Sequence, residues 1–499
     1  MKDHQFCGYM SNANMQFQSE TQKLFNERML SHFALTPTQG QLRMFYAFTR
    51  MMFSLKNRCA LTIKGYAGTG KTTSVKAMVA ALYEHDFKCV LLAPTGRAAK
   101  VLSNYTGHPA FTIHKHIYQR VAGPNGQLWF DLRDNEASDT VFFVDEASMI
   151  SDSAGMAGGE AASGDLLEDL IRHVYSGQNC KLVFIGDNAQ LPPVGMAESP
   201  ALQTDLMGAR YFLNIAEVKL EQVMRQKQES GILFNATRIR DNIQANHSGV
   251  EATWPVLDLT DFTDLQVVNE ELQEQVENAY RTFGAEETII ITKSNKRSNL
   301  FNQQVRQNIL WFEEEIATGD RMMVIRNNYF WLSQTNERFN AAFIANGDVI
   351  RITRVRNFED RGAFRFCKAE ITLDDYPEIP EREVILLCST IWEESAGISQ
   401  EKMRELANLI ALDYPDITNA RELKKAVYSD PYYNALHVKF AYAVTCHKAQ
   451  GGQWPAVFID HGYLTDEMAG KEFSRWLYTA LTRAREKVFL IGFDPKLIQ

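Results

Sequence analysis

The chain lacks the sequence features typical of secreted disulfide-rich proteins, of zinc-binding proteins and of membrane proteins. Its seven cysteines are scattered over 499 residues without a C-x-x-C pair, so the sequence predicts neither a disulfide framework nor a zinc site. No apolar run approaches the ~20 residues needed to cross a bilayer, and the first twenty residues lack the apolar core of a signal peptide. We therefore expect a cytoplasmic protein with no membrane contact.

An excess of positive charge is also missing, since the formal net charge is −9 at pH 7. This balance argues against a protein that coats duplex DNA, but a narrow groove for a single strand depends on local charge and stacking instead. The hydrophobic content of 45% is that of an ordinary folded chain, and its length predicts about three domains. Composition therefore leaves nucleic-acid binding open.

The most informative segment that is present is GYAGTGKT, at residues 65–72, which fits the pattern G-x-x-x-x-G-K-[ST] in full. A short apolar, strand-like run precedes it at 59–63, and residues 74–83 after it are apolar at helical spacing. A strand, a glycine loop and a helix in this order are the context in which the pattern forms a phosphate-binding loop. The sequence therefore predicts a protein that binds a nucleoside triphosphate.

The residue types of this loop suit phosphate binding. Its glycines let the backbone turn inward so that amide N–H groups face the phosphates, and the following helix adds a partial positive charge. Lys71 is expected to reach the β- and γ-phosphates, and the Thr72 hydroxyl to hold Mg²⁺. The predicted ATP contacts in the loop are Gly65, Ala67, Gly68, Thr69, Gly70, Lys71, Thr72 and Thr73.

Two further motifs follow buried apolar runs. In VDEASM (144–149), Asp145 is expected to complete the Mg²⁺ shell and Glu146 to orient and deprotonate the attacking water. In GDNAQLPPVG (186–195), Gln190 is placed to sense the γ-phosphate, and Asp187 to couple that sensor to a neighbouring segment. The second motif alone is more typical of a proline-stiffened turn than of a functional site, so its order relative to the other motifs carries the interpretation.

Buried-strand patterns alternate with helical patterns in two stretches of the chain. They lie at 59–63, 89–93, 141–144 and 181–185, and again at 288–292, 456–460 and 487–492. Such alternation predicts an α/β protein with two parallel sheets, each covered by helices on both faces.

Other segments depart from this alternation. Residues 118–132 contain two extended runs around Pro-Asn-Gly, a strong hairpin signal. Residues 347–392 are typical of a small antiparallel β module, which a charged helical stretch follows at 399–429. The polar residues 1–34 are expected to be a loosely attached extension with one helix, and the Gly/Ala/Ser-rich run 151–165 a mobile surface loop.

The order of the motifs resembles that of superfamily 1 helicases, in particular the RecD-like, superfamily 1B branch. From residue 35 onward the chain carries GYAGTGKT, LLAPTGRAAK (91–100), TIHK (112–115), VDEASM, GDNAQLPPVG, LEQVMRQ (220–226), NGD (346–348), AVTCHKAQG (443–451) and YTALTRAR (478–485). The resemblance implies two RecA-like P-loop NTPase domains, one at 35–215 and one at 216–346 with 437–499. It also implies a pin hairpin inserted at 116–138 and an SH3-like β insertion with helices at 347–436.

The resemblance also assigns roles to residues. Gln39 matches the glutamine that reads the adenine edge, and Arg225 and Arg483 match the arginines that reach the γ-phosphate from the second domain. Gln453 stands where many relatives have a glutamate that bonds the ribose. The segments that contact the nucleic-acid strand in the family supply Pro94, Thr95, Arg97, Thr112, His114, Asn295, Thr445, His447 and Lys448, and the hairpin supplies Trp129.

The sequence thus predicts a Mg²⁺- and ATP-dependent DNA helicase that acts as a monomer on single-stranded, forked or tailed DNA. The 5′-to-3′ direction rests on the resemblance alone. An RNA helicase of the same superfamily remains an alternative, because phosphate contacts do not exclude a 2′-hydroxyl. A nucleotide-switched loader that does not unwind is the alternative from another class.

Overall fold

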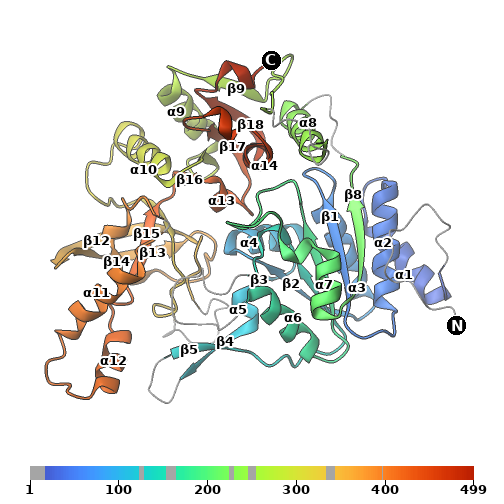
Figure 1. The fold of residues 1–499 in the computed structure, drawn as a ribbon, viewed down its shortest axis with the longest axis horizontal. Helices are drawn as coiled ribbons and strands as arrows, with labels where there is room; N and C mark the ends of the chain where they lie inside the picture. Colours follow the sequence, from blue (N-terminus) through green and yellow to red (C-terminus); the bar gives the residue numbers. More distant parts are fainter. Residues whose placement is uncertain are drawn as a thin grey trace.

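The computed structural model describes residues 17–122, 128–152, 165–223, 230–245, 254–332, 343–395 and 397–499. They form two α/β halves and a β barrel with a helical arm (Figure 1). Among the described residues, no helix is long and apolar enough to cross a membrane. The prediction of two RecA-like halves with inserted β modules is confirmed.

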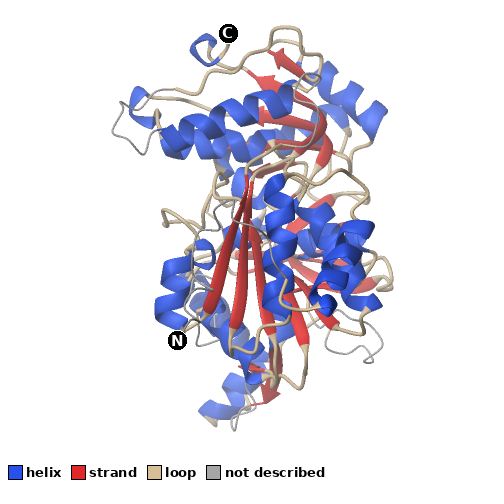
Figure 2. Ribbon diagram, turned by 90° about the vertical axis from the view of Figure 1, so that its right-hand side faces the viewer, coloured by secondary structure: helices blue, strands red, loops and turns tan. Residues whose placement is uncertain are grey.

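The first half is built on a six-stranded parallel sheet in the order β3-β2-β6-β7-β1-β8. Helices cover both of its faces (Figure 2), because alternate strand residues point to opposite sides. Phe143 packs with α2 (Gln39–Met52) and α3 (Lys71–Glu84), whereas Phe142 packs with α6 (Leu166–Ser176). The strands are β1 (Cys59–Gly65), β2 (Lys88–Ala93), β3 (Ala110–Thr112), β6 (Thr140–Val144), β7 (Lys181–Gly186) and β8 (Asn214–Leu220).

The helices of this half follow the strands in sequence. They are α2 (Gln39–Met52), α3 (Lys71–Glu84), α4 (Gly96–Thr106), α5 (Ile113–Ile117), α6 (Leu166–Ser176) and α7 (Thr204–Tyr211). Since β8 pairs with β1 as far as Leu220, the first half extends five residues beyond the boundary expected at 215. The strand pattern of β8 is interrupted by Glu217 and Lys219. The Glu217 carboxylate forms ion pairs with both Lys64 and Lys219.

One helix of the expected N-terminal extension belongs to the core of the first half. Phe25 and Met29 of α1 (Glu20–His32) are fully buried against α2 and α3. The Phe25 ring lies 6.3 Å from that of Phe48, between centroids. The expectation of a loosely attached extension is therefore wrong for α1, because Phe25 and Met29, one turn apart on the same helical face, complete the core.

The second half has a five-stranded parallel sheet in the order β16-β10-β17-β18-β9. Its strands are β9 (Leu265–Val268), β10 (Thr288–Thr292), β16 (Ala443–Thr445), β17 (Trp454–Asp460) and β18 (Ala484–Ile491). Its helices are α8 (Gly231–Ala245), α9 (Leu272–Phe283), α10 (Asn295–Gln304), α13 (Cys446–Ala449) and α14 (Lys471–Leu481). Helix α14 faces the first half and carries residues of the candidate site.

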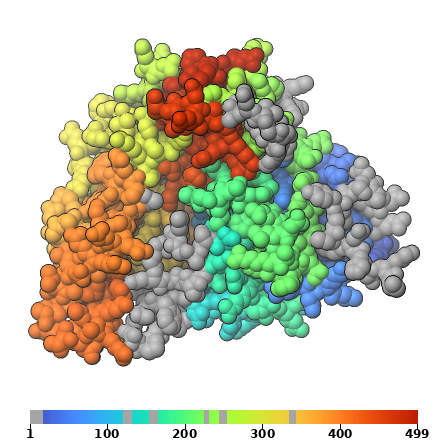
Figure 3. All heavy atoms as spheres, in the orientation of Figure 1, coloured from blue at the N-terminus to red at the C-terminus, as the bar shows by residue number. Residues whose placement is uncertain are grey.

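The β module is a closed five-stranded barrel. It comprises β11 (Arg321–Val324), β12 (Val349–Arg361), β13 (Phe364–Leu373), β14 (Arg382–Leu387) and β15 (Leu436–Phe440). Because β11 pairs with both β12 and β15, the barrel takes in strands from outside the expected 347–436 segment. Helices α11 (Gln400–Ala411) and α12 (Ala420–Tyr428) form an arm at the edge of the molecule, drawn in orange (Figure 3).

The hairpin expected at 118–132 is present. Strands β4 (Tyr118–Ala122) and β5 (Leu128–Leu132) are antiparallel, and Ala122 pairs with Leu128. The Tyr118 hydroxyl donates a 2.8 Å hydrogen bond to Asp169 of α6, which anchors the hairpin base to the first half. The turn residues 123–127 and most of the expected surface loop at 151–165 lie outside the described residues.

Candidate nucleotide site between the two halves

The glycine loop joins β1 to α3, as the sequence predicts. Gly68 and Gly70 have φ values of 76° and 81°, in the left-handed region that favours glycine. A Cβ on Gly70 would lie 2.7 Å from the Gln41 side-chain nitrogen, so a side chain there would also be too close. The Lys71 ammonium donates hydrogen bonds to the carbonyls of Gly65, at 2.6 Å, and Tyr66, at 3.0 Å. The lysine thus lies over the loop on which the phosphates are expected.

Gln41, rather than the predicted Gln39, contacts the glycine loop. Its side-chain amide donates a 3.0 Å hydrogen bond to the Thr69 carbonyl and accepts one from the Thr38 N–H in a capping box at the start of α2. Gln41 is fully buried, whereas Gln39 is exposed beside it. The adenine-reading role of Gln39 stays a prediction. The T-x-x-Q spacing of 38–41 is a capping-box signal from which Gln41 was recognisable in the sequence.

Asp145 and Glu146 follow β6 at the carboxyl end of the sheet. Burial and the neighbouring Glu146 raise the pKa of Asp145 to about 7. Glu146 has a φ of 51°, so its backbone is left-handed. The described residues hold no cluster of three or more His, Cys, Asp or Glu side chains suited to a metal. A half-buried carboxyl beside a second one fits a divalent cation, which Asp145 and Thr72 would hold.

The loop after β7 is buried between the two halves. Gln190 is 5% exposed, and its side-chain oxygen has no hydrogen-bond partner within the described part of the chain. Asp187 accepts hydrogen bonds from the Ala189 N–H at 2.9 Å and from the Tyr478 hydroxyl at 2.7 Å. Asp187 therefore joins this loop to α14 of the second half.

Arg483 of the second half faces the acid pair of the first. Its guanidinium lies 3.9 Å from the Glu146 carboxylate, and it donates to the carbonyls of Thr479 and Gly452 at 3.1 Å and 3.3 Å. Arg483 is only 3% exposed. Arg225, the other arginine expected at the γ-phosphate, lies outside the described residues.

The segments expected to contact nucleic acid lie at the carboxyl ends of parallel strands. Thr95 and Thr112 cap α4 and α5, and each side chain accepts a hydrogen bond from a backbone N–H of its helix. Asn295 is the first residue of α10, and Thr445 precedes α13. Four helix beginnings, two from each half, thus follow β2, β3, β10 and β16. Pro94 precedes Thr95 in the same turn after β2.

The basic residues of these segments are mostly engaged by other residues. The Arg97 guanidinium lies 4.0 Å from the Trp454 ring centre, Lys100 pairs with Asp375 at 3.3 Å, and Arg297 pairs with Asp460. The Arg97 stack joins α4 to the start of β17, next to the exposed Gln453. The roles of Arg97 in DNA binding and of Gln453 in ribose binding stay predictions.

The pKa values of the two candidate histidines are lowered. Desolvation lowers the pKa of His114 to about 4 and lowers that of His447, whose side chain is exposed. Burial likewise lowers the pKa of Lys448 to about 8, and this side chain donates to Asn346 of the barrel. The Trp129 side chain lies outside the described part of the chain.

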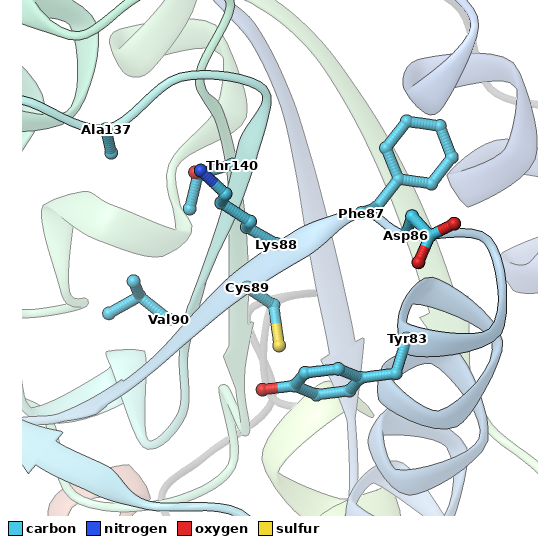
Figure 4. Close-up of a pocket in the computed structure, with 8 residues that line it drawn as sticks. All are labelled: Tyr83, Asp86, Phe87, Lys88, Cys89, Val90, Ala137 and Thr140. Atoms are coloured by element: carbon cyan, nitrogen blue, oxygen red, sulfur yellow. The ribbon is translucent and has the colours of Figure 1, made fainter.

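A cavity of about 480 Å³ opens elsewhere, at the amino end of β2 (Figure 4). It is lined by Tyr83, Asp86, Phe87, Lys88, Cys89, Val90, Ala137 and Thr140. The glycine loop lies at the carboxyl end of β1, so this cavity is separate from the candidate nucleotide site.

Known families match both halves. The AAA domain matches residues 47–252, and the UvrD-like helicase C-terminal domain matches residues 440–491. The chain is 25% identical over 479 residues to the ATP-dependent DNA helicase Dda of Enterobacteria phage T4, with 91% of this chain and 99% of that protein covered. It is 23% identical over 443 residues to the ATP-dependent RecD2 DNA helicase of Deinococcus radiodurans, with 87% of this chain and 47% of that protein covered.

An uncharacterized protein of Methanocaldococcus jannaschii is 24% identical over 500 residues, with 88% of this chain and 37% of that protein covered. The chain therefore spans nearly all of the phage protein but under half the length of the other two relatives. A structure of Pif1 helicase from Bacteroides in complex with ADP-AlF3 and single-stranded DNA has a TM-score of 0.45 at 14% identity, covering 93% of this chain and 95% of that one.

Proposed function

We propose that this chain, which is related to the superfamily 1B helicases, is an ATP-dependent DNA helicase. It would use ATP held between its two halves to move along single-stranded DNA and to unwind the duplex ahead. The observation that carries the proposal is the position of Arg483, which reaches from the second half to within 3.9 Å of Glu146 in the first. A site completed by both halves couples the state of the nucleotide to their separation.

The first half is proposed to bind the triphosphate. The amides of the glycine loop and the Lys71 ammonium would neutralise the phosphate charge, with Lys71 exchanging its present carbonyl partners for phosphate oxygens. Thr72 and Asp145 would hold Mg²⁺, which would supply positive charge to stabilise the phosphates. Gln39 is proposed at the adenine and Gln453 at the ribose.

Hydrolysis is proposed to need residues of both halves. Glu146 would accept a proton from the attacking water, and Gln190 would orient that water or contact the γ-phosphate. Arg483, together with Arg225, would stabilise the charge that develops on the transferred phosphoryl group. The buried Arg483 has no carboxylate closer than Glu146 among the described ion pairs, so its charge remains available for this role.

The strand is proposed to lie across the helix beginnings after β2, β3, β10 and β16. Thr95 and Thr112 belong to the first half, and Asn295 and Thr445 to the second. Polar side chains and backbone amides bind phosphates without regard to base sequence. Opening and closing of the halves would change the distance between the helix beginnings of the first half and those of the second. One pair would then hold the strand while the other pair moves along it.

The hairpin β4–β5 is proposed to separate the strands, with Trp129 stacking on the last base pair. Translocation is proposed to run from 5′ to 3′, as the family relationship implies. A single chain carries every residue assigned to the nucleotide site, so we propose that a monomer suffices.

A strand-displacement assay tests the proposal most directly. Duplexes with a 5′ tail, a 3′ tail or both are incubated with protein, ATP and Mg²⁺, and the Lys71→Ala variant serves as the control without hydrolysis. In the parent protein we expect displacement of duplexes that carry a 5′ tail and not of duplexes that carry a 3′ tail alone. The Lys71→Ala variant should displace no duplex. Displacement only from 3′-tailed duplexes would overturn the direction, and none from any duplex, despite ATP hydrolysis stimulated by single strands, would overturn the helicase proposal.

An ATPase assay on the same protein distinguishes the DNA helicase proposal from an RNA helicase and from a nucleotide-switched loader. ATPase stimulation is compared between poly(dT) and poly(U) at equal nucleotide concentration. Stronger stimulation by poly(U) would favour an RNA helicase. Slow turnover that neither polymer changes would favour a nucleotide-switched loader.

A further inference from the structure

Tyr478 connects three parts of the nucleotide site. Its hydroxyl accepts a 2.9 Å hydrogen bond from the Ala67 N–H of the glycine loop and donates a 2.7 Å hydrogen bond to the Asp187 carboxylate. Tyr478 belongs to α14 of the second half, whereas Ala67 and Asp187 belong to the first. One phenol oxygen thus joins the phosphate-binding loop, the loop after β7 and the second half.

The contact between Tyr478 and Asp187 is buried, and in it the phenol is the donor and the carboxylate is the acceptor. Tyr478 and Asp187 are each 1% exposed. Burial and the Asp187 charge raise the pKa of Tyr478 well above its ordinary value, so the phenol keeps its proton for Asp187. The second carboxylate oxygen of Asp187 accepts from the Ala189 N–H at 2.9 Å. Every polar atom in this series of hydrogen bonds, from the Ala67 N–H through the Tyr478 hydroxyl and the Asp187 carboxylate to the Ala189 N–H, therefore has a partner.

Neighbouring residues of the second half hold the same loop. The Thr479 hydroxyl accepts a 2.8 Å hydrogen bond from the Leu191 N–H, and the Gln450 amide donates a 2.7 Å hydrogen bond to the Leu191 carbonyl. Gln190, the proposed γ-phosphate sensor, lies between Asp187 and Leu191 in sequence. The loop that carries this sensor is therefore fixed to α14 on both sides of Gln190.

We infer that Tyr478 is a positioning residue that couples the phosphate-binding loop and the Gln190 loop to closure of the two halves. The inference rests on the proposed function and deepens it. Ala67 directs its N–H to the second half, so the loop conformation that holds this bond is tied to the position of α14. A movement of α14 on binding of the nucleic-acid strand therefore changes the positions of both the glycine loop and Asp187.

The test is Tyr478→Phe in the full chain, which removes one oxygen and keeps the ring in the apolar cluster it shares with Leu477 and Leu481. Steady-state ATPase is measured with and without poly(dT) over a range of ATP concentrations. We expect kcat with poly(dT) to fall at least about tenfold, or ~1.4 kcal/mol in the barrier, while KM for ATP changes less than about threefold. The ratio of stimulated to unstimulated turnover falls as well.

Tyr442→Phe is a matched control. The Tyr442 hydroxyl also donates to a buried carboxylate, Asp320 at 3.0 Å, and accepts from a backbone N–H, that of Arg321 at 3.1 Å. Tyr442 is 2% exposed, but its partners lie next to the barrel and not in the nucleotide site. We expect a similar loss of thermal stability in both variants and a loss of stimulated turnover only in Tyr478→Phe.

The outcomes separate the inference from the function on which it rests. A parent protein that hydrolyses ATP in response to poly(dT), with a Tyr478→Phe variant that matches Tyr442→Phe in turnover, would overturn the inference alone. A parent protein without hydrolysis would overturn both. Asp187→Asn breaks the same chain from the carboxylate side, so it gives the same decision if Tyr478→Phe fails to fold.

Discussion

Lys71 and Glu146 belong to the same site, but we expect their replacement to have different effects on ATP binding and on hydrolysis. Lys71→Ala removes the cation expected at the β- and γ-phosphates, so both ATP affinity and hydrolysis should fall severely. Glu146→Gln keeps the size and hydrogen bonds of the side chain but cannot accept a proton, so ATP should bind while turnover falls ~100-fold or more. Equilibrium binding of a fluorescent ATP analogue and single-turnover hydrolysis measure the two quantities separately.

Thermal unfolding of both variants without nucleotide checks that each one folds. If Glu146→Gln loses ATP affinity as severely as Lys71→Ala, Glu146 is a ground-state binding residue and not the base.

Asp348, in the turn before β12, provides a residue-scale prediction about pH. It is 1% exposed, one carboxylate oxygen accepts from the Ala345 N–H at 2.7 Å, and the other has no partner among the described residues. Burial and the nearby Asp375 raise the pKa of Asp348 to about 8, against a smaller opposing effect of Lys115. The folded protein therefore holds a proton that the unfolded chain releases above about pH 4.

The sign of the pH dependence follows from that difference. The contribution of Asp348 to folding is fully present below pH 4 and is lost as the pH rises toward 8. Asp348→Asn is neutral at every pH, so it should gain stability relative to the parent across this range. At ~1.4 kcal/mol per pKa unit, the gain at pH 8 is on the order of a few kcal/mol. Urea unfolding at pH 5 and pH 8 measures it, and an equal difference at both values would contradict the burial of a protonated carboxyl.

Residues were predictable from the sequence where their chemistry is local. The glycine loop and the Asp145–Glu146 pair were found because spacing along one strand and one turn sets their geometry. Gln41 was recognisable from its capping-box spacing, whereas Tyr478 was missed because its contact with Ala67 joins residues that are 411 positions apart in the chain. A motif match names the segment, but only the packing of the two halves decides which of its side chains meet across them, as Tyr478 meets Ala67.

At the scale of elements, the hairpin β4–β5 allows a test of coupling. If it separates the strands, shortening its turn at Pro124-Asn125-Gly126 should uncouple translocation from unwinding. ATPase stimulated by single-stranded DNA should stay near the parent level, because the hairpin is anchored through Tyr118 to α6 and not to the nucleotide site. Unwinding of a 5′-tailed duplex should fall at least about tenfold, since nothing would hold the fork apart.

The ATPase of the same variant is the internal control for this experiment. Unwinding at the parent rate, or a parallel loss of both activities, would mean that the hairpin has a structural role and does not separate the strands.

Elements were predictable where one apolar pattern is continuous, as in β1, β2, β6 and β7. Helix α1 was misjudged because only two of its apolar side chains, Phe25 and Met29, are fully buried in an otherwise mostly polar segment. The barrel was placed too narrowly, since β11 and β15 are separated by more than a hundred residues and their pairing is antiparallel across that distance. Long-range strand pairing leaves no signal in either strand alone.

The whole molecule works, on the proposed function, by bringing an arginine of one half to the phosphates bound by the other. Arg483→Ala should therefore depress turnover far more than nucleotide affinity, because it acts on charge that develops during phosphoryl transfer. We expect kcat to fall ~100-fold or more, while the Kd for ATP changes only a few-fold. A nucleotide titration and a steady-state ATPase titration with poly(dT) measure the two effects.

Arg485→Ala is the matched control, because Arg485 lies two residues after Arg483, near the start of β18, but is exposed and pairs with Glu287 at 2.6 Å on the surface. An exposed ion pair contributes at most ~1 kcal/mol, so this variant should keep both affinity and turnover. Equal losses of affinity and turnover in Arg483→Ala would mean that the arginine holds ATP in the ground state. In that case the two halves would close on the nucleotide before catalysis begins, and the step that responds to DNA would have to lie in ATP binding itself.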